Sequence, residues 1–384
     1  NAHFATKFVD EKGNWLDLAH RKNISSDIAP TSAQMPRAVG LAFASKAFRS
    51  IEELHQFENL SDNGNEVCFC TIGDAATSEG HFWETMNAAG VLQVPLAVFV
   101  WDDGYGISVP KKFQTTKASI SKAMSGFQKE DDSNGINIYR LKGWDYAGMC
   151  EILDGAIKHI RETHTPALFH VEELTQPQGH STSGSHERYK SSSRLEWEKQ
   201  WDCKKQMREW IQANSLADEN ELSDIEDNAR QFVKQSKQNA WLKYITPIKD
   251  QVKEAIILLK EYAINSKDNS ELGKWIAELS ALREPLRRDV MKILSLIIDT
   301  ANTDDGLDGI KEYYAKLLKE NSDLYDTHLY NEGPKSALKV KAVRADIPAD
   351  APIVNGFEVL NKYFDQLFES NPKVIAFGED LVRI

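Results

Sequence analysis

The amino-acid sequence predicts an α/β fold in which a parallel sheet is flanked by helices and accompanied by an α-helical insert. In the first half of the chain, short apolar runs alternate with stretches of helical periodicity. Such alternation is typical of right-handed strand–helix–strand crossovers, which connect parallel strands. From about residue 195 to 335, apolar residues recur at helical spacing and the sequence contains no convincing strand.

The elements of the sheet region follow from these patterns in chain order. Apolar, strand-like runs of about six residues alternate with longer stretches in which apolar residues recur every three or four positions. We therefore expect, in order, a strand at 66–72, a helix at 79–92, strands at 96–101 and 136–141, a helix at 146–161 and a strand at 167–172.

The second half of the chain predicts a helical insert, a linker and the start of another domain. Apolar residues recur at helical spacing at 248–259 and 286–297, and Pro285 suits a helix start. The segment 333–352, rich in Ala, Pro and Lys, resembles a linker, and Asn355 suits the N-cap of a further helix before a strand at 373–377. The expected domains are 1–195, 196–335, a linker at 336–353 and 354–384.

Composition excludes several classes of protein. The chain has 384 residues, 41% hydrophobic and 27% charged, which is the balance of a globular protein with more than one domain. No run of about 18 apolar residues is present, so no membrane span is expected. A net charge of −12 disfavours general nucleic-acid binding. The four cysteines lack zinc-site spacing, which favours reduced thiols and a cytoplasmic location.

The strongest functional signal lies where two of the predicted strands end. Asp74 follows the first strand and precedes a predicted helix, whose N-terminal N–H groups can bind a phosphate. Asp103 follows the next strand, 29 residues later, which is about the length of one crossover. Either aspartate alone is usually a turn former or a helix cap. Together they indicate a magnesium–diphosphate site, because Mg²⁺ prefers a few carboxylates together with phosphate oxygens.

These residues carry a resemblance to a known family. The stretch from Gly73-Asp74 to Asp103 resembles the thiamine diphosphate motif, which reads Gly-Asp-Gly and then, after one crossover, Asn-Asn. The segments 78–80 (Ser-Glu-Gly) and 105–108 (Tyr-Gly-Ile-Ser) are similar to the alpha chain of 2-oxo acid dehydrogenases at the same offsets. This resemblance runs from about residue 24 to 190. Residues 354–380 look like the first helix and strand of the beta chain, as in the fused form of some bacterial enzymes.

The resemblance implies a thiamine-diphosphate-binding fold and a role for each matching residue. Magnesium would be bound by the side chains of Asp74 and Asp103 and by the backbone carbonyl of Tyr105. The remaining cofactor contacts would come from the N–H groups of Ala75 and Ala76, from Ile107 and Ile28, which support the folded shape of the cofactor, and from Ser26. The family's activating glutamate and the N-terminal part of the first domain are expected outside residues 1–384, so this segment alone is expected to be an incomplete catalyst.

Three departures from the family pattern concern the cofactor site. Ala75 stands where glycine is usual, and Asp102-Asp103 stands where Asn-Asn is usual. An added negative charge beside a diphosphate costs about 1–4 kcal/mol, which a nearby cation or a proton on one carboxylate could offset. The turn between Ser26 and Gln34 is longer than its counterpart in the family.

A second motif, Gly-His-Ser-Thr-Ser-Gly-Ser at 179–185, follows the last predicted strand. Its composition alone fits an ordinary surface loop. In the family such a loop borders the active-site channel, and its histidine, here His180, lies near the reacting carbon and can donate a proton. We expect residues 178–193 to be mobile without cofactor. Animal relatives are phosphorylated in this loop, and a phosphate at Ser181 would add negative charge, but this regulation is not expected here.

The activity implied by the resemblance is oxidative decarboxylation of a 2-oxo acid, with transfer of the acyl group to a lipoyl arm. The expected partners are a lipoyl-bearing acyltransferase within a multienzyme complex and either a second copy or a beta-type part. Similarity leans towards branched-chain substrates. An acetoin-cleaving or pyruvate-type thiamine diphosphate enzyme is the nearest alternative, and the motif text argues against a transketolase. An inactive scaffold is the alternative from another class.

Overall fold

The computed structural model describes residues 5–26, 28–177, 179–180, 186–265, 270–301, 306–326 and 331–378. The chain divides into two compact units, one formed by Asn1–Leu216 with Lys341–Ile384 and the other by Ala217–Val340. Each unit is described by itself. The bounds of the segments expected from the sequence, 1–195, 196–335, 336–353 and 354–384, stay a prediction.

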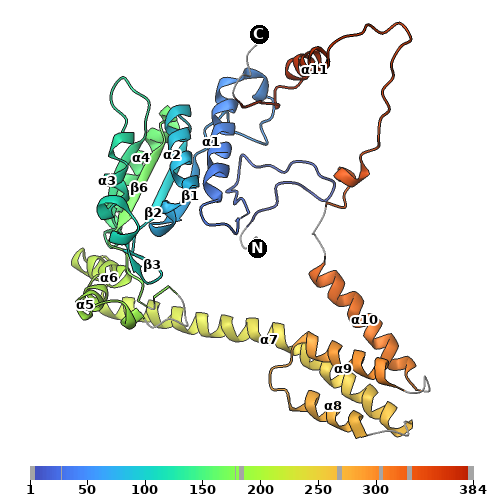
Figure 1. The fold of residues 1–384 in the computed structure, drawn as a ribbon. Coiled ribbons are helices and arrows are strands. Elements are labelled where there is room, and N and C mark those ends of the chain that lie inside the picture. The colour runs from blue at the N-terminus through green and yellow to red at the C-terminus, as the bar shows by residue number, and fades with distance from the viewer. Residues whose placement is uncertain are drawn as a thin grey trace. The chain divides into compact units, whose positions relative to one another are not determined.

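The first unit is built around a four-stranded parallel sheet, which confirms the predicted α/β fold class (Figure 1). The strand order across the sheet is β1 (Cys68–Gly73), β2 (Leu96–Trp101), β6 (Ala167–Glu172) and β5 (Asn137–Lys142). In the register of these pairs, Gly73 lies opposite Trp101, and Trp101 lies opposite Val171. The carboxyl ends of β1, β2 and β6 therefore meet at one edge, where parallel sheets commonly bind ligands.

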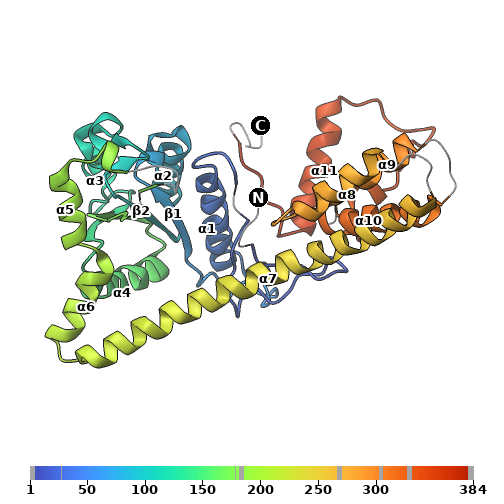
Figure 2. The same ribbon diagram turned by 90° about the horizontal axis from the view of Figure 1, so that it is seen from below.

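Helices cover both faces of this sheet (Figure 2). The helices of the sheet region are α1 (Gln34–Ser50), α2 (Gly80–Leu92), α3 (Ile120–Ala123) and α4 (Tyr146–Thr163). Because side chains alternate along a strand, Val98 and Val100 of β2 pack with α1, α2 and α3, whereas Phe99 packs on the other face with Ile160 of α4. Both apolar clusters are buried, so the sheet is a rigid base for the residues at its edge.

After the sheet, the first unit continues with α5 (Ser192–Gln200) and α6 (Cys203–Ala213). Its C-terminal part contains α11 (Gly356–Ser370), which begins directly after Asn355, as predicted. The predicted strand at 373–377 is wrong, because in the described residues up to 378 this run forms no strand. An extended run becomes a strand only through hydrogen bonds to a neighbouring strand. Here the run instead contacts α1 through the rings of Phe377 and Phe43, whose centroids are 5.0 Å apart.

The second unit is helical, as predicted. Its helices are α7 (Glu219–Asn265), α8 (Ser270–Ala281), α9 (Arg287–Thr300) and α10 (Asp308–Tyr325). Several apolar positions predicted at helical spacing, among them Val252, Leu259, Ile293 and Ile297, are buried together in one core, whereas Leu286 is exposed. In the part of the chain that the structure describes, no helix has both the length and the apolar character to cross a membrane.

Candidate active site

The edge at which the strands end brings together the acidic residues predicted from the sequence. The N–H group of Asp74, directly after β1, donates to the carbonyl of Trp101 at 3.2 Å. The N–H group of Asp102, directly after β2, donates to the carbonyl of Val171 at 2.9 Å. These bonds continue the sheet pattern by one residue. Asp74 therefore lies beside Asp102 and Asp103.

Asp74 has the properties of a residue placed to bind a cation. Its side chain is only 5% exposed, and its Oδ2 atom is buried without a hydrogen-bond partner among the described residues. Burial, followed by the negative charges of Asp102 and Asp103, raises the pKa of Asp74 to about 7. A buried carboxylate oxygen without a partner is unfavourable. A divalent cation at Oδ2 would supply the missing interaction, so the residues fit the implied metal.

The turn after β2 holds Asp103 and Tyr105 in a defined arrangement. Oδ1 of Asp103 accepts a hydrogen bond from the N–H group of Tyr105 at 3.1 Å. Burial raises the pKa of the Asp103 carboxyl, although the Tyr105 N–H group and the nearby cation Lys190 oppose that shift. Tyr105 begins a short antiparallel pair, β3 (Tyr105–Gly106) with β4 (Val109–Pro110). The proposed metal ligands on this turn are therefore placed by local backbone contacts.

A short turn separates Asp74 from α2, which begins within one residue of the predicted start at 79. A single 3-10 turn, η2 (Ala75–Ser78), follows Asp74, and α2 begins only at Gly80. The N–H groups of Ala75 and Ala76 thus belong to this turn and not to the N-terminus of α2. The methyl group of Ala75, which departs from the family's glycine, is accommodated by Gly106. A Cβ atom on Gly106 would lie 2.7 Å from the Ala75 Cβ atom.

Ile107 occupies a strained position in the turn between β3 and β4. Its φ angle is +58°, and its side chain is 60% exposed. Positive φ is unfavourable for a β-branched residue, and such strain is concentrated at functional sites. An apolar side chain held outwards at this energetic cost is consistent with contact to a bound ligand.

A cavity of about 320 Å³ lies beside the end of β1. Its lining includes Ile28, Gly73, Ala76 and Trp101, so predicted cofactor residues from two distant segments meet here. Ser26 lies just outside this lining, and the Arg37 guanidinium donates to its backbone carbonyl. The long turn between Ser26 and Gln34 therefore forms one wall of the cavity.

His180 is exposed, and its backbone hydrogen-bonds with Tyr189. The ring of Tyr189 lies 5.8 Å from that of Tyr105, measured between centroids. Tyr189 thus connects the histidine motif to the turn that carries Asp103. Ser181 and the rest of 181–185, together with Gln178, lie outside the described residues, so the expected mobility and modification of this loop stay predictions.

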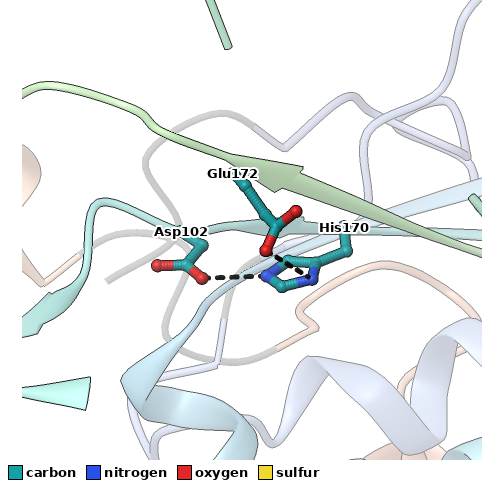
Figure 3. Close-up of side chains that lie close together, drawn as sticks. All are labelled: Asp102, His170 and Glu172. Carbon is teal, nitrogen blue, oxygen red and sulfur yellow. Dashed lines mark hydrogen bonds and ion pairs between the residues drawn. The ribbon is translucent and has the colours of Figure 1, made fainter. Parts of the chain in front are cut away.

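Sequence reasoning missed a charged network beneath the site, drawn in Figure 3. Asp102, His170 and Glu172 are all buried, and their possible ligand atoms lie within 4.8 Å of one another. The sequence pattern places His170 among surface and packing histidines, but it is fully buried and hydrogen-bonds to Asp102 through Nε2 at 2.9 Å. A polar residue within the otherwise apolar strand 167–171 was the signal in the sequence that could have revealed it.

A second missed network joins α5 to the turn after β2. Arg194 donates from Nη2 to the backbone carbonyl of Asp103 at 2.7 Å and from Nε to Glu198 at 2.8 Å. The side chain of Glu198 also pairs with Lys190 at 2.8 Å, and both of these side chains are almost fully buried. The guanidinium group of Arg194 lies over the rings of Tyr105 and Trp197. This network holds the backbone of the turn in place.

The raised pKa of Asp74 predicts a pH-dependent stability. Between the usual value of 3.8 and about 7, the folded chain binds a proton that the unfolded chain releases. Without metal, the free energy of unfolding should therefore fall as pH rises through this range. In Asp74→Asn this fall should be smaller, because only the contribution of Asp103, whose pKa is also raised, remains, and the variant should be the more stable protein by about 2–4 kcal/mol above pH 7. Denaturant titrations at several pH values in chelator would test it, and parallel profiles of the two proteins would contradict it.

Comparison with known proteins identifies the family. A family model described as "Dehydrogenase E1 component" matches residues 7–248. The pyruvate dehydrogenase E1 component subunit alpha of Rickettsia bellii (strain RML369-C) is 28% identical over 205 residues, 53% of this chain and 56% of that protein. The 2-oxoisovalerate dehydrogenase subunit alpha 1, mitochondrial, of Arabidopsis thaliana is 25% identical over 245 residues, 62% of this chain and 47% of that protein. The chain spans about half the length of these relatives. Since the family model covers more than half of its residues, the chain belongs to the dehydrogenase E1 component family.

Proposed function

We propose that this chain is the thiamine-diphosphate-binding, alpha-type part of the decarboxylating component of a 2-oxo acid dehydrogenase. The observation that carries the proposal is the buried Oδ2 atom of Asp74, which has no hydrogen-bond partner among the described residues and lies at the edge where Asp103 also lies. Magnesium would be held by the carboxylates of Asp74 and Asp103 and by the backbone carbonyl of Tyr105. Oxygen ligands of this kind match the preference of Mg²⁺ for carboxylates and for phosphate oxygens.

The other site residues would bind and orient the cofactor and the substrate. The N–H groups of Ala75 and Ala76 would donate to the diphosphate, and Ile107 and Ile28 would support the rings. When bound, thiamine diphosphate supplies the electron sink for decarboxylation. His180 would donate a hydrogen bond from its imidazole to negative charge that develops on the substrate oxygen. These roles are supported by the placement of the residues at the carboxyl edge of the sheet.

The substrate and partners belong to the same proposal. The names of the relatives include pyruvate and 2-oxoisovalerate dehydrogenases, and identities of 28% and 25% do not separate the two substrate classes. We propose that the substrate is a 2-oxo acid. The sequence motifs favour a branched-chain substrate, and a substrate screen tests this preference. The acyl acceptor would be a lipoyl-bearing acyltransferase in the cytoplasm. Residues 354–384 would be the start of a beta-type part, in a homodimeric or alpha/beta-type assembly.

A substrate screen tests this function directly. The full-length protein would be assayed against pyruvate, branched-chain 2-oxo acids and acetoin with an artificial electron acceptor. We expect turnover of a 2-oxo acid only when both thiamine diphosphate and Mg²⁺ are present. Preferred cleavage of acetoin would contradict the proposed reaction. Absence of cofactor binding in calorimetry would contradict the cofactor as well and would favour the scaffold alternative.

A further inference from the structure

We propose that Lys111 and His170 are positioning residues for the metal site. They pair with the buried carboxylate of Asp102 and thereby fix the turn that presents Asp103 and Tyr105. The inference rests on the proposed magnesium and thiamine diphosphate site. It assigns a role to the residue that departs from the family's first asparagine and to two basic residues that the motif does not contain.

The side chain of Asp102 is fully committed to contacts within the protein. It is 2% exposed, and Oδ2 accepts hydrogen bonds from Lys111 Nζ at 2.7 Å and from His170 Nε2 at 2.9 Å. Oδ1 accepts from the N–H group of Gly104 at 2.8 Å. Its two oxygens thus connect two basic side chains to the backbone of the turn. Hydrogen bonds of this kind from outside the metal's own ligands orient those ligands.

Lys111 and His170 are themselves held in place. The N–H group of Lys111 donates to the carbonyl of Gly104 at 2.9 Å, so Lys111 contacts the turn through its backbone as well as its side chain. His170 is fully buried, and its Nδ1 lies 2.9 Å from the hydroxyl of Ser121. In the tautomer with the proton on Nε2, His170 donates to Asp102 and accepts from Ser121. The pairing therefore joins β6 and α3 to the turn.

The cations also decide which carboxylates remain for a metal. Lys111 Nζ and His170 Nε2 both donate to Oδ2 of Asp102, whose side chain is 2% exposed. Asp102 is thus a paired carboxylate, whereas Oδ2 of Asp74 has no partner among the described residues. Without Lys111, the buried carboxylate of Asp102 would lose its ion-pair partner and would compete for the same cation. The pairing thereby reserves the metal for Asp74 and Asp103.

A separate metal site at Asp102, His170 and Glu172 is disfavoured by the same charges. Oε2 of Glu172 accepts from Arg140 Nε at 3.0 Å and from Nη2 at 2.7 Å. The two carboxylates are thus balanced by two cations, Arg140 and Lys111. Each ion pair offsets the carboxylate charge that would otherwise attract a metal ion to this cluster. The cluster is therefore a support for the neighbouring site.

The pairing makes a specific prediction about coupled substitutions. An asparagine at 102, the family's usual residue, needs no cation because it carries no charge. Lys111→Met should weaken Mg²⁺-dependent binding of thiamine diphosphate by about 10-fold or more, as expected for loss of a supporting contact. Asp102→Asn should bind nearly as well as the wild type. In the double variant Asp102→Asn/Lys111→Met, affinity should return to within about threefold of Asp102→Asn, because the charge that required Lys111 is gone.

Isothermal titration calorimetry with and without Mg²⁺, together with thermal unfolding of the ligand-free proteins, would measure this cycle. Lys112→Met is the matched control, since its exposed side chain lies over Phe113, away from Asp102, and its affinity should not change. If Lys111→Met fails to fold, Lys111→Arg provides a second test, because it keeps the charge and should bind the cofactor nearly normally. His170→Phe should weaken binding and should likewise be relieved by Asp102→Asn.

The possible results separate this inference from the proposed function. Equal losses from Lys111→Met in the wild-type and Asp102→Asn backgrounds, or no loss in either, would overturn the positioning role while wild-type binding remained intact. Failure of the wild-type protein to bind thiamine diphosphate with Mg²⁺ would overturn the proposed function, and the positioning role with it. Relief of the Lys111→Met defect by Asp102→Asn, in affinity and in the ligand-free melting temperature, would support the pairing.

Discussion

Replacing Asp74 by alanine is expected to abolish Mg²⁺-dependent binding of thiamine diphosphate, with a loss of affinity of more than about 100-fold. Loss of a supporting residue alone lowers metal affinity by about 10–100-fold, and Asp74 is proposed to contact the metal itself. The fold should persist, because Asp74 follows β1 and is not part of either apolar cluster of the sheet. Calorimetric titration of the cofactor, with and without Mg²⁺, would measure the loss.

Two controls make the Asp74 result interpretable. Asp131→Ala removes an exposed acidic residue from a loop away from the carboxyl ends of the strands, so it should leave the affinity for the cofactor unchanged. Thermal unfolding without ligand should show that Asp74→Ala is at least as stable as the wild type, because a buried and unpaired carboxylate is removed. Unchanged cofactor affinity in Asp74→Ala would exclude Asp74 from the site.

Asp103 should tolerate asparagine but not alanine. Asp103→Asn keeps a side-chain oxygen for the metal and removes one negative charge beside the diphosphate, so affinity should be kept or increased. Asp103→Ala removes the oxygen and should weaken binding by about 10–100-fold. Burial is the largest cause of the raised pKa of Asp103, so the surroundings of this carboxylate disfavour its charged form. The same calorimetric titration compares the three proteins.

The cations around Asp103 limit how much the asparagine variant can gain. Lys190 and Arg194 favour the ionised carboxylate, so removing its charge also removes that attraction. We therefore expect Asp103→Asn to change the affinity for the cofactor by less than about 10-fold. The lost attraction to these cations offsets part of the relieved repulsion from the diphosphate. A loss as large as that of Asp103→Ala would show that the carboxylate is required, and the charge argument would be wrong.

Local pattern was sufficient for the elements of the sheet. The apolar runs predicted as strands at 96–101 and 167–172 coincide with β2 and β6, and the predicted helix at 146–161 is α4 with two more residues. These elements can be predicted because a buried face requires apolar residues at a regular spacing within a single segment. The positions of Asp74 and Asp103 at strand ends followed from the same runs, since only one residue separates each apolar stretch from its aspartate.

Local pattern failed where an element depends on a distant partner. The run at 373–377 has the composition of a strand, but a strand requires a neighbour with which to exchange hydrogen bonds, and this run is irregular in the described residues. The predicted helix at 79–92 agrees with α2, but the 3-10 turn Ala75–Ser78, which separates this helix from Asp74, was not predicted.

The sequence by itself determined the fold class, the parallel sheet and the pair of strand ends at which a magnesium–diphosphate site is proposed. Only the tertiary structure decided how the unusual Asp102-Asp103 pair is accommodated. His170 lies 68 residues from its partner Asp102, and Arg194 lies 91 residues from Asp103. The physical reason is that the charge balance of a buried site is set by side chains brought together through space, and no local periodicity records which of them will meet.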